Sequence, residues 1–375
     1  MRIAVLAETA ANEDRVAATP ETVKKFIGLG ASVVVARGAG LRSGLRDGDF
    51  EAAGASLADG NAAAAADADV VLAVRRPDGV AVKRGALVCA IMDPYGQDAA
   101  LAGLAHAGAS AVAMELMPRI TRAQVMDVLS SQANLAGYRA VLDAAAEYGR
   151  AIPMMMTAAG TVPAAKVFIM GVGVAGLQAI ATARRLGAIV TATDVRPATK
   201  EQVESLGAKF LAVEDEEFKQ AQTAGGYAKE MSKEYQAKQA ELTASHIAKQ
   251  DIVVTTALIP GRPAPKLISA AMVRSMRPGS VIVDLAVERG GNCELSKPGE
   301  VVEVDGVKIV GHLNVAGRLA ATASALYAKN LFAFVETLVD KKEKKLAVNW
   351  DDELVKATLL TRDGAVVHPN FQPKG

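Results

Sequence analysis

A glycine-rich turn between an expected strand and an expected helix constrains this chain most. Residues 166–170 are mainly apolar, Gly171-Val-Gly-Val-Ala-Gly176 follows them, and residues 177–185 have helical character. In such a unit, Gly171 permits the tight turn, Gly173 lets the backbone approach a pyrophosphate, and Gly176 lets the helix pack closely on the strand. The phosphates would lie at the N-terminus of the helix. The motif predicts a dinucleotide site, and the alternative is a turn that only packs a helix.

An acidic residue follows the next apolar run. Residues 190–193 are expected to form a strand, and Asp194 comes directly after it, about twenty residues beyond the glycine motif. Its carboxylate can accept hydrogen bonds from ribose hydroxyls and would repel a 2′-phosphate. Arg196 and Lys200 lie nearby and would suit that phosphate. Because the carboxylate stands at the tip of the strand, the sequence favours NAD(H) over NADP(H).

Apolar runs alternate with helical stretches along most of the chain, as in α/β proteins. The first series has strands expected at 3–6, 32–35, 70–74, 87–91 and 110–113, with helices such as 21–29 and 99–107. The second series has strands expected at 167–170, 189–193, 209–211, 252–255, 280–283 and 308–310. Six strands complete a Rossmann sheet. We therefore expect two Rossmann-like α/β domains with parallel sheets and a cofactor in the interdomain cleft.

The length of 375 residues exceeds that of one ordinary domain. Residues 320–338 are expected to form one long helix that returns the chain to the first domain. The predicted organisation is an N-terminal domain of residues 1–135 plus 331–375 and a nucleotide-binding domain of residues 136–330. Residues around 362–364 carry a hairpin signal. The apolar segment 153–167 is either a hairpin exchanged between subunits or an internal linker.

Composition excludes several classes of protein. With 42 basic and 41 acidic residues, the net charge of +1 gives no general attraction to nucleic acid or to an anionic membrane. Cys89 and Cys293 lack metal-ligand spacing, so buried free thiols in a reducing cytoplasm are expected. The four histidines form no ligand pair, and no metal site is expected. We expect neither an export signal nor a segment that inserts into a bilayer.

A polar helical face is expected near the junction between the domains. On a helix that begins near Thr121, one stripe contains Gln124, Asp127, Ser131 and Asn134, with Ser130 at its edge. These carboxamide, carboxylate and hydroxyl groups can hydrogen-bond a nicotinamide carboxamide, and Arg119 can approach a phosphate or the ring amide. An ordinary solvated helix face is the alternative.

Two further features allow two interpretations each. Residues 218–250 are polar and lack a strand signal, and they form either a solvated amphipathic helix or a loop that closes over the cofactor. His312 follows an expected strand and is a candidate acid or base, but its short motif favours a structural role.

Several segments together resemble the NAD(H)-binding subunit, or domain I, of proton-translocating nicotinamide nucleotide transhydrogenases. The resemblance covers essentially the whole chain. It is carried by residues 12–20, 114–140, 153–163, 171–176, 193–196, 225–231, 255–261 and 283–292.

The resemblance implies roles for particular residues. Those expected to hold the nicotinamide end are Arg119, Gln124, Asp127 and Ser130. Those expected at the adenosine end, beside Gly171, Gly173 and Gly176, are Val174, Asp194, Val195 and Arg196. The family also has a mobile loop, residues 225–231 here, that folds over the nucleotide. It implies further candidate contacts, which are Gly226, Tyr227, Met231 and Gln239. Leu258, at the end of an expected strand, is another.

The resemblance also implies an activity and partners. Hydride would pass directly from NADH on this chain to NADP⁺ on a separate NADP(H)-binding domain, and membrane-spanning subunits would couple the transfer to proton translocation. Two copies would form a homodimer, peripheral at the cytoplasmic face of a bacterial inner membrane. Hydride exchange between nicotinamides needs no protein acid or base, which fits the scarcity of catalytic side chains.

Two other functions compete with this one. Alanine dehydrogenases are similar in architecture and in the context of Arg15, where their arginine binds the substrate carboxylate. This chain has Arg75 where that family has a lysine, and residues 88–93 contain no catalytic histidine. A non-enzymatic NAD(H) sensor would bind the nucleotide without turnover.

Overall fold

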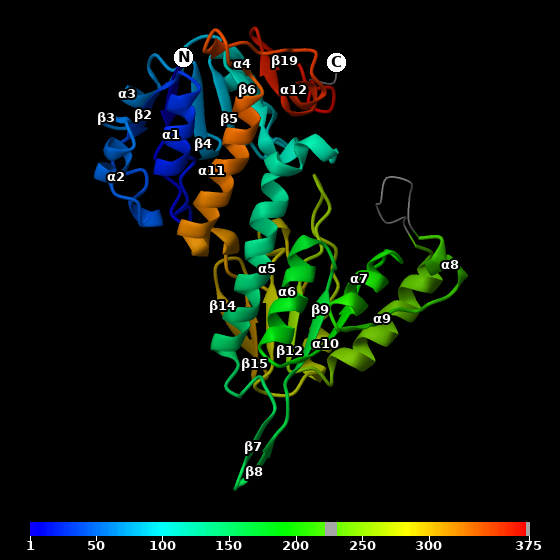
Figure 1. Ribbon diagram of the computed structural model, residues 1–375. Helices are drawn as coiled ribbons and strands as arrows, with labels where there is room; N and C mark the ends of the chain where they lie inside the picture. The colour runs from blue at the N-terminus through cyan, green and yellow to red at the C-terminus, as the bar shows by residue number, and fades with distance from the viewer. Residues whose placement is uncertain (222–230, 373–375) are drawn as a thin grey trace. The chain divides into compact units, whose positions relative to one another are not determined.

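The computed structural model describes residues 1–221 and 231–372, which form two compact units (Figure 1). Unit 1 comprises Met1–Gln132 and Ala316–Gly375, and unit 2 comprises Ala133–Val315. The chain therefore returns to unit 1 at Ala316, earlier than the predicted residue 331. The prediction divided the long helix 320–338 between domains, whereas its buried residues all belong to unit 1.

Unit 1 is built on a parallel sheet of six strands in the order β3-β2-β1-β4-β5-β6. The strands are β1 (Arg2–Val5), β2 (Ser32–Ala36), β3 (Ser56–Ala58), β4 (Val70–Arg75), β5 (Leu87–Ile91) and β6 (Ser110–Ala113). Five of them were predicted. The three-residue β3 was missed because it lies at the edge of the sheet and none of its residues is fully buried.

Helices and short hairpins complete unit 1. The helices are α1 (Pro20–Gly28), α2 (Asp47–Ala52), α3 (Asn61–Ala65), α4 (Asp98–His106), α11 (Ala320–Glu336) and α12 (Glu353–Thr358), with short 3₁₀ turns η1 (Leu41–Ser43), η2 (Met114–Leu116) and η3 (Thr121–Met126). The hairpins pair β16 (Val339–Asp340) with β17 (Lys345–Leu346) and β18 (Thr361–Arg362) with β19 (Ala365–Val366). The second hairpin confirms the turn signal, since Asp363 and Gly364 both have positive φ.

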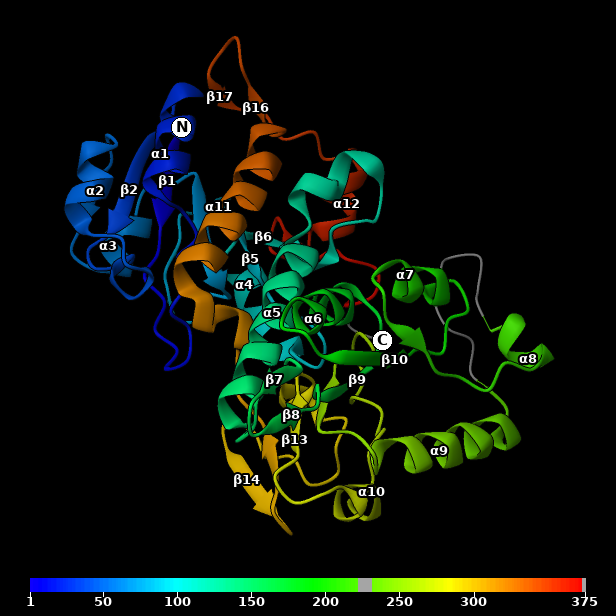
Figure 2. The same cartoon turned by 60° about the horizontal axis from the view of Figure 1, so that its bottom comes forward.

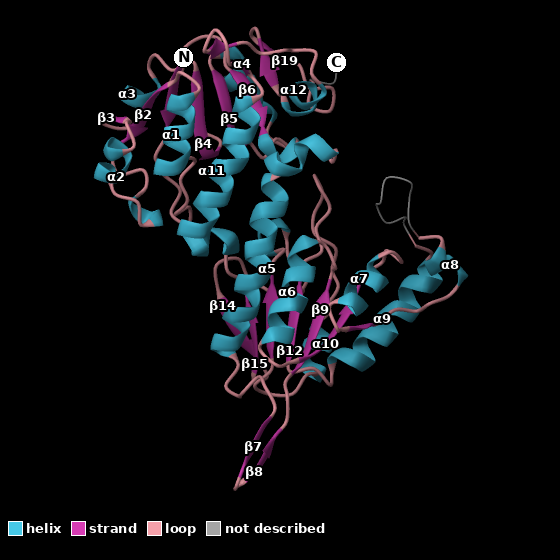
Figure 3. Cartoon of the chain, viewed as in Figure 1, coloured by secondary structure: helices cyan, strands magenta, loops and turns pink. Residues whose placement is uncertain are grey.

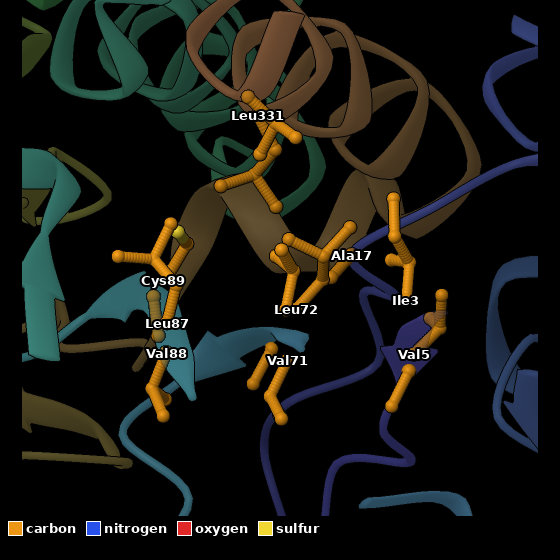
Figure 4. Packing of buried hydrophobic residues seen from close by; sticks show 14 of the residues in the cluster. Ile3, Val5, Ala17, Val71, Leu72, Leu87, Val88, Cys89 and Leu331 are labelled. Atoms are coloured by element: carbon orange, nitrogen blue, oxygen red, sulfur yellow. The ribbon is translucent and has the colours of Figure 1, made fainter. Parts of the chain in front are cut away.

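Apolar side chains of α11 form one side of the core of unit 1. Tyr327, Leu331 and Phe334 have no exposed surface. Figure 4 shows Leu331 over the sheet residues Leu72 and Cys89, which belong to the same buried cluster. Burial of a side chain of this size stabilises the fold by about 1.5–3 kcal/mol, which explains why α11 stays with this sheet.

Unit 2 is built on a sheet of seven strands in the order β11-β10-β9-β12-β13-β15-β14. Strands are magenta in Figure 3, where β9, β12, β14 and β15 are labelled. The strands are β9 (Lys166–Met170), β10 (Ile189–Thr193), β11 (Lys209–Phe210), β12 (Ile252–Thr255), β13 (Val281–Asp284), β14 (Val301–Val304) and β15 (Val307–Val310). All are parallel except β14, an edge strand that the sequence did not predict. In chain order the parallel strands follow the Rossmann sequence 3-2-1-4-5-6. The predicted fold class is confirmed in both units.

The helices of unit 2 include α5 (Val128–Glu147), which begins in unit 1, α6 (Val174–Arg185), α7 (Thr199–Ser205), α8 (Glu216–Lys219), α9 (Lys233–Ile247) and α10 (Ala270–Ser275). The 3₁₀ turns are η4 (Val287–Arg289) and η5 (Val315–Leu319), which crosses the second boundary. The polar segment 218–250 therefore contains the expected helix as α9. Of its proposed loop, residues 225–231, only Met231 lies within the described residues. Within the described part of the chain, no helix combines the length and apolarity needed to cross a bilayer.

A hairpin of β7 (Met155–Thr157) and β8 (Gly160–Val162) projects from unit 2 (Figure 1). The side chains of Met154, Met155 and Met156 are all exposed. The structure thus shows that residues 153–167 contain a hairpin. A two-stranded hairpin has little stability by itself in water.

The strand order locates one switch point in each sheet. In open α/β sheets, ligands bind beyond the carboxyl ends of the strands where the order reverses. That place lies between β1 and β4 in unit 1 and between β9 and β12 in unit 2. The two switch points are described separately below.

Candidate functional site

The turn after β9 has the geometry that the glycine motif predicts. Gly171 has φ +99°, and a Cβ there would lie 2.5 Å from Thr256 Oγ1. A Cβ on Gly176 would lie 1.9 Å from the carbonyl oxygen of Gly171. At Gly173, by contrast, a Cβ would meet nothing within 4 Å. Two glycines are therefore required by the protein's own packing, and the third leaves open space in front of the turn.

Helix α6 starts directly at this open space. Gly173 is its N-cap residue, and no side chain caps the first turn. The first amide groups of a helix carry a partial positive charge and lack partners within the helix. The start of α6 is therefore suited to bind phosphate oxygens.

A close approach of α5 to α6 positions that first turn. A Cβ on Gly137 of α5 would lie 2.0 Å from the carbonyl oxygen of Ala175, the second residue of α6. The two helices lie side by side in Figures 1 and 2. Sequence reasoning missed the role of Gly137, because a glycine inside a helical run shows no local signal of what it touches.

Asp194 follows β10 and holds the glycine turn. Its Oδ2 accepts hydrogen bonds from the Val172 amide at 2.7 Å and from Arg196 Nη2 at 3.0 Å. Its Oδ1 accepts from the Arg196 amide and from Arg196 Nε, each at 2.9 Å. This ion pair raises the pKa of the Arg196 guanidinium. The carboxylate thus has four donors, three of them from Arg196.

Exposed apolar side chains gather at the same edge of the sheet. Val174 follows β9 across the turn, Val195 follows β10, and Leu258 and Ile259 follow β12. Their exposed fractions run from 37% for Val174 to 53% for Leu258. Three of them were predicted contacts, and Ile259 was not. Apolar surface beside a phosphate-binding turn is suited to cover a flat heteroaromatic ring.

The other predicted nucleotide contacts in unit 2 have surroundings that differ from one to the next. Met231 is 8% exposed and belongs to the hydrophobic core of this unit, and its contact with the nucleotide stays a prediction. Gln239 links α9 to the sheet, because its Oε1 accepts from the Val213 amide and its Nε2 donates to Thr193 Oγ1. Gly226 and Tyr227 lie outside the described residues.

The predicted nicotinamide-binding segment lies in unit 1. The expected continuous helix from Thr121 is wrong, since Thr121–Met126 is a 3₁₀ turn and Asp127 has ψ 93°. Asp127 instead caps α5, and its carboxylate accepts from the amide of Ser130 at 2.9 Å and from Ser130 Oγ at 2.5 Å. An aspartate that caps a helix competes with helical backbone before it. The predicted single stripe is therefore broken at Asp127.

The structure brings two of the four predicted side chains together. Asp127 and Ser130 share two hydrogen bonds. The side chains of Arg119 and Gln124, which come earlier in the chain, are exposed. Ser131, expected on the same stripe, instead donates to Asn330 Oδ1 at 2.7 Å. Arg119, Gln124, Asp127 and Ser130 remain on one short segment of unit 1, from which Arg119 and Gln124 face solvent.

The switch point of unit 1 is filled by its own charged side chains. Arg15 is 3% exposed, and its Nε and Nη2 donate to the two carboxylate oxygens of Glu13, each at 2.7 Å. Arg15 Nη1 donates to Gln132 Oε1 at 2.8 Å, and Arg75 Nε donates to Glu13 Oε2 at 2.8 Å. Although burial opposes ionisation, the two guanidinium groups lower the pKa of Glu13 to about 2. Arg15 is thus an ion-pair residue here.

A second carboxylate occupies the end of β4. Glu8 Oε1 accepts from the amides of Val74 at 2.6 Å and Arg75 at 3.3 Å. Burial raises the pKa of Glu8 to about 7, with a further contribution from the negative charge of Glu13. A similar arrangement closes β5, where the Glu115 carboxylate accepts from the amides of Met92 and Asp93.

Among the described residues, the cysteines and the possible metal ligands form no further site. Cys89 and Cys293 are buried free thiols, as predicted, and burial raises the pKa of both. The residues that the structure describes contain no cluster of three or more histidine, cysteine, aspartate or glutamate side chains placed to hold a metal ion.

Comparison with known proteins supports the resemblance of the sequence. A family model described as "Alanine dehydrogenase/PNT, N-terminal domain" matches residues 4–136, and one described as "Alanine dehydrogenase/PNT, C-terminal domain" matches residues 140–369. An NAD(P) transhydrogenase alpha subunit of Rhodospirillum rubrum is 57% identical over 383 residues, covering 100% of both chains. An alanine dehydrogenase of Halomonas elongata is 30% identical, covering 98% of this chain and 95% of the relative.

Solved structures give the same order of similarity. A crystal structure of transhydrogenase from Sinorhizobium meliloti has a TM-score of 0.89 at 62% identity and covers 98% of this chain and 100% of that chain. An L-alanine dehydrogenase has a TM-score of 0.81 at 25% identity, with 99% and 98% covered. The chain belongs to the alanine dehydrogenase/PNT family, and its similarity to the transhydrogenase alpha subunits is much greater than its similarity to the alanine dehydrogenases.

Proposed function

We propose that this chain is the NAD(H)-binding subunit of a proton-translocating transhydrogenase. The observation that carries the proposal is the open turn at Gly173 in unit 2, in a chain 57% identical along its whole length to a transhydrogenase alpha subunit. Two neighbouring glycines are fixed by packing, and the start of α6 faces the space that a pyrophosphate would take. This is the arrangement expected of a dinucleotide site.

The proposed nucleotide is NAD(H), because a carboxylate stands where a 2′-phosphate would lie. Asp194 is held by four donors, and a carboxylate offers about four acceptor positions. A ribose hydroxyl must therefore replace a donor, and Arg196 supplies three of the four. Binding of the ribose would thus draw Arg196 away from Asp194, toward the adenosine. Val174, Val195 and Leu258 would cover the adenine ring.

We assign the nicotinamide end to the segment of unit 1 that carries Arg119, Gln124, Asp127 and Ser130. The bound nicotinamide supplies the hydride chemistry itself. These side chains would bind and orient the carboxamide, since Asp127 and Ser130 already form a fixed polar pair. The side chains of Arg119 and Gln124 are exposed on the same segment, where a ligand could reach them. No protein group needs to take up a proton in this step.

The charged switch point of unit 1 argues against an alanine dehydrogenase. In that function Arg15 would receive the carboxylate of the amino acid. Here Glu13 already holds Arg15 through two hydrogen bonds, and the pKa of about 2 for Glu13 keeps this carboxylate charged at neutral pH. Residues 88–93 also contain no histidine. A substrate carboxylate would have to displace a buried ion pair.

The proposal includes partners. Hydride would pass to NADP⁺ on an NADP(H)-binding domain, and membrane-spanning subunits would couple this transfer to proton translocation and hold the chain at the cytoplasmic face. We also infer a homodimer. Its support is the exposed methionine hairpin of unit 2, which would gain the apolar cover it lacks by packing on a second copy. Light scattering of the purified protein tests this dimer.

Reconstitution tests the function. NADH and an NADP⁺ analogue are added to three samples. The first contains this protein alone, the second a purified NADP(H)-binding transhydrogenase domain alone, and the third contains both. We expect hydride transfer only when both proteins are present. NADH oxidation by this protein alone with pyruvate and ammonia would instead support an amino-acid dehydrogenase. Tight NADH binding with an inactive mixture would support a sensor.

A further inference from the structure

The loop of residues 256–265 forms the second side of the switch point in unit 2. It follows β12, the strand next to β9 across the reversal of strand order. Leu258 and Ile259 are 53% and 45% exposed on it. Three of its residues are prolines, which fix φ and donate no backbone hydrogen bond. The loop therefore depends on other groups to hold its position.

Asn292 supplies those hydrogen bonds from a buried position. Its side chain has no exposed surface, and its Oδ1 accepts from the Ala257 amide at 3.0 Å. Its Nδ2 donates to the carbonyl oxygens of Ala257 at 2.9 Å and Pro265 at 2.8 Å. One side chain thus ties together the two ends of the loop. Every bond of this carboxamide goes to the loop backbone.

Thr256 joins the loop to the glycine turn. Its Oγ1 donates to the carbonyl oxygen of Gly171 at 3.0 Å, and its amide donates to the carbonyl of Met170 at 2.9 Å. The same hydroxyl oxygen lies only 2.5 Å from the position that a Cβ on Gly171 would take. The positive φ of Gly171 and the position of Thr256 are therefore set together.

Asp284 anchors Asn292 in turn. Its Oδ2 accepts from the Cys293 amide at 3.0 Å and from Ser296 Oγ at 2.7 Å. Its Oδ1 accepts from Thr255 Oγ1 at 3.2 Å and from the Ala286 amide at 3.0 Å. This buried carboxylate thus connects the end of β12 with the turn that carries Asn292. The chain of contacts runs from Asp284 through Asn292 and Thr256 to Gly171.

We propose that Asn292 and Thr256 are positioning residues for the nucleotide, which hold the 256–265 loop and the Gly171 turn as one preformed wall. The inference rests on the proposed NAD(H) site. A preformed loop does not have to be ordered when the ligand binds, so its rigidity favours affinity. Both residues act through backbone that faces the nucleotide, and neither has to touch the reacting ring.

Two pairs of variants test this role. Thr256→Val removes the hydroxyl with little change of shape, and Thr256→Ser keeps it. Asn292→Asp keeps the size and one acceptor, but it sets an oxygen against two carbonyl groups. Ser280→Ala is the matched control, because Ser280 donates a buried hydrogen bond to the Gln250 carbonyl at the amino end of β13, away from the loop.

The readouts are the NADH dissociation constant by calorimetry and the apparent KM and kcat of the reconstituted transfer. Loss of one hydrogen bond corresponds to about a fivefold change. We expect Thr256→Val to weaken NADH binding about fivefold and to raise KM while kcat stays the same. Asn292→Asp should have a larger effect of the same kind, whereas Thr256→Ser and Ser280→Ala should stay within twofold of wild type.

The two hypotheses fail in different ways. If wild type does not bind NADH, the proposed function is wrong. If wild type binds NADH but Thr256→Val and Asn292→Asp bind it equally well while folded, as melting curves would show, the positioning role is wrong. Equal losses in Thr256→Ser and Thr256→Val would also overturn it, because the hydroxyl would then not matter.

Discussion

The parallel strands of the two units have the same order, but the switch point is open in one sheet and filled by side chains in the other. In unit 2 the place between β9 and β12 is lined by glycines, a helix start and exposed apolar side chains. In unit 1 the place between β1 and β4 is filled by Glu8, Glu13 and Arg15, which bond to one another or to the strand end. The difference shows that a topological switch point offers space for a ligand only when side chains leave it open.

The charges explain why the first switch point is closed. A buried guanidinium and a buried carboxylate compensate each other's loss of hydration only with good geometry, and the Arg15–Glu13 pair has two parallel hydrogen bonds. A ligand that entered would have to break these bonds. The switch point of unit 1 is thus occupied by a buried ion pair, whereas the switch point of unit 2 is open to a ligand.

Removal of the buried Arg15 side chain should cause the largest loss of stability. Arg15→Ala leaves the carboxylate of Glu13 buried with Arg75 as its remaining cation, and we expect the free energy of unfolding to fall by about 3–5 kcal/mol. Urea unfolding at neutral pH measures it. Arg75→Ala is the control, because Arg75 is 39% exposed and its pair should contribute about 0–1 kcal/mol. Similar losses in both variants would contradict the assignment of Arg15 as the buried partner.

A methyl group at Gly176 should displace the glycine turn at the open switch point of unit 2. The added Cβ would lie 1.9 Å from the backbone of Gly171, so the turn must move. We expect Gly176→Ala to lower the free energy of unfolding by about 1–3 kcal/mol and to abolish measurable NADH binding. Gly103→Ala in α4 is the control, since a Cβ there meets nothing and should stabilise the helix by about 0.5–1 kcal/mol. A Gly176→Ala protein with normal affinity would disprove the packing argument.

The pH dependence of stability should reveal the carboxyl group of Glu8. Its pKa of about 7 lies above the ordinary 4.5, so the folded state binds this proton more tightly than the unfolded state does. Its contribution is fully present below pH 4.5 and is lost as pH rises through 7. From pH 5 to pH 8, the free energy of unfolding of Glu8→Gln should therefore rise by about 2.5 kcal/mol relative to that of wild type.

Urea unfolding at both pH values gives this difference directly. Glu13 does not interfere, because its pKa of about 2 confines its own contribution to changes below about pH 4.5. That contribution is present above pH 4.5 and is lost as pH falls toward 2. If Glu8→Gln and wild type change in parallel from pH 5 to pH 8, Glu8 does not hold a proton in the folded protein.

Gly173→Ala should give the smallest effect, a loss of NADH affinity without a loss of stability. Nothing in the protein lies within 4 Å of the added Cβ, and φ −81° is accessible to alanine. We expect unchanged stability, within about 0.5 kcal/mol, but about tenfold weaker NADH binding, or 1.4 kcal/mol, because the methyl group meets the pyrophosphate. Calorimetry together with a melting curve separates the two quantities. Unchanged affinity would show that the phosphates do not approach this turn.

Much of the fold followed from local patterns. The runs that form β4 and β12 are buried and apolar, and such runs between turns indicate strands of a parallel sheet. The edge strands β3 and β14 escaped prediction because their residues are only partly buried. The break at Asp127 was also missed, since the choice between helix interior and helix cap depends on the Ser130 contact.

The sequence by itself determined the two α/β units and the glycine turn, with Asp194 at the end of the next strand. Only the tertiary structure decided which unit holds α11, that Gly137 touches Ala175, and that Asn292 ties the 256–265 loop to its place. Periodicity and turn chemistry act between neighbours in the chain, so they can be predicted locally. The pairing of Arg15 with Gln132, or of Thr256 with Gly171, joins residues far apart in the sequence, and packing of the whole unit decides it.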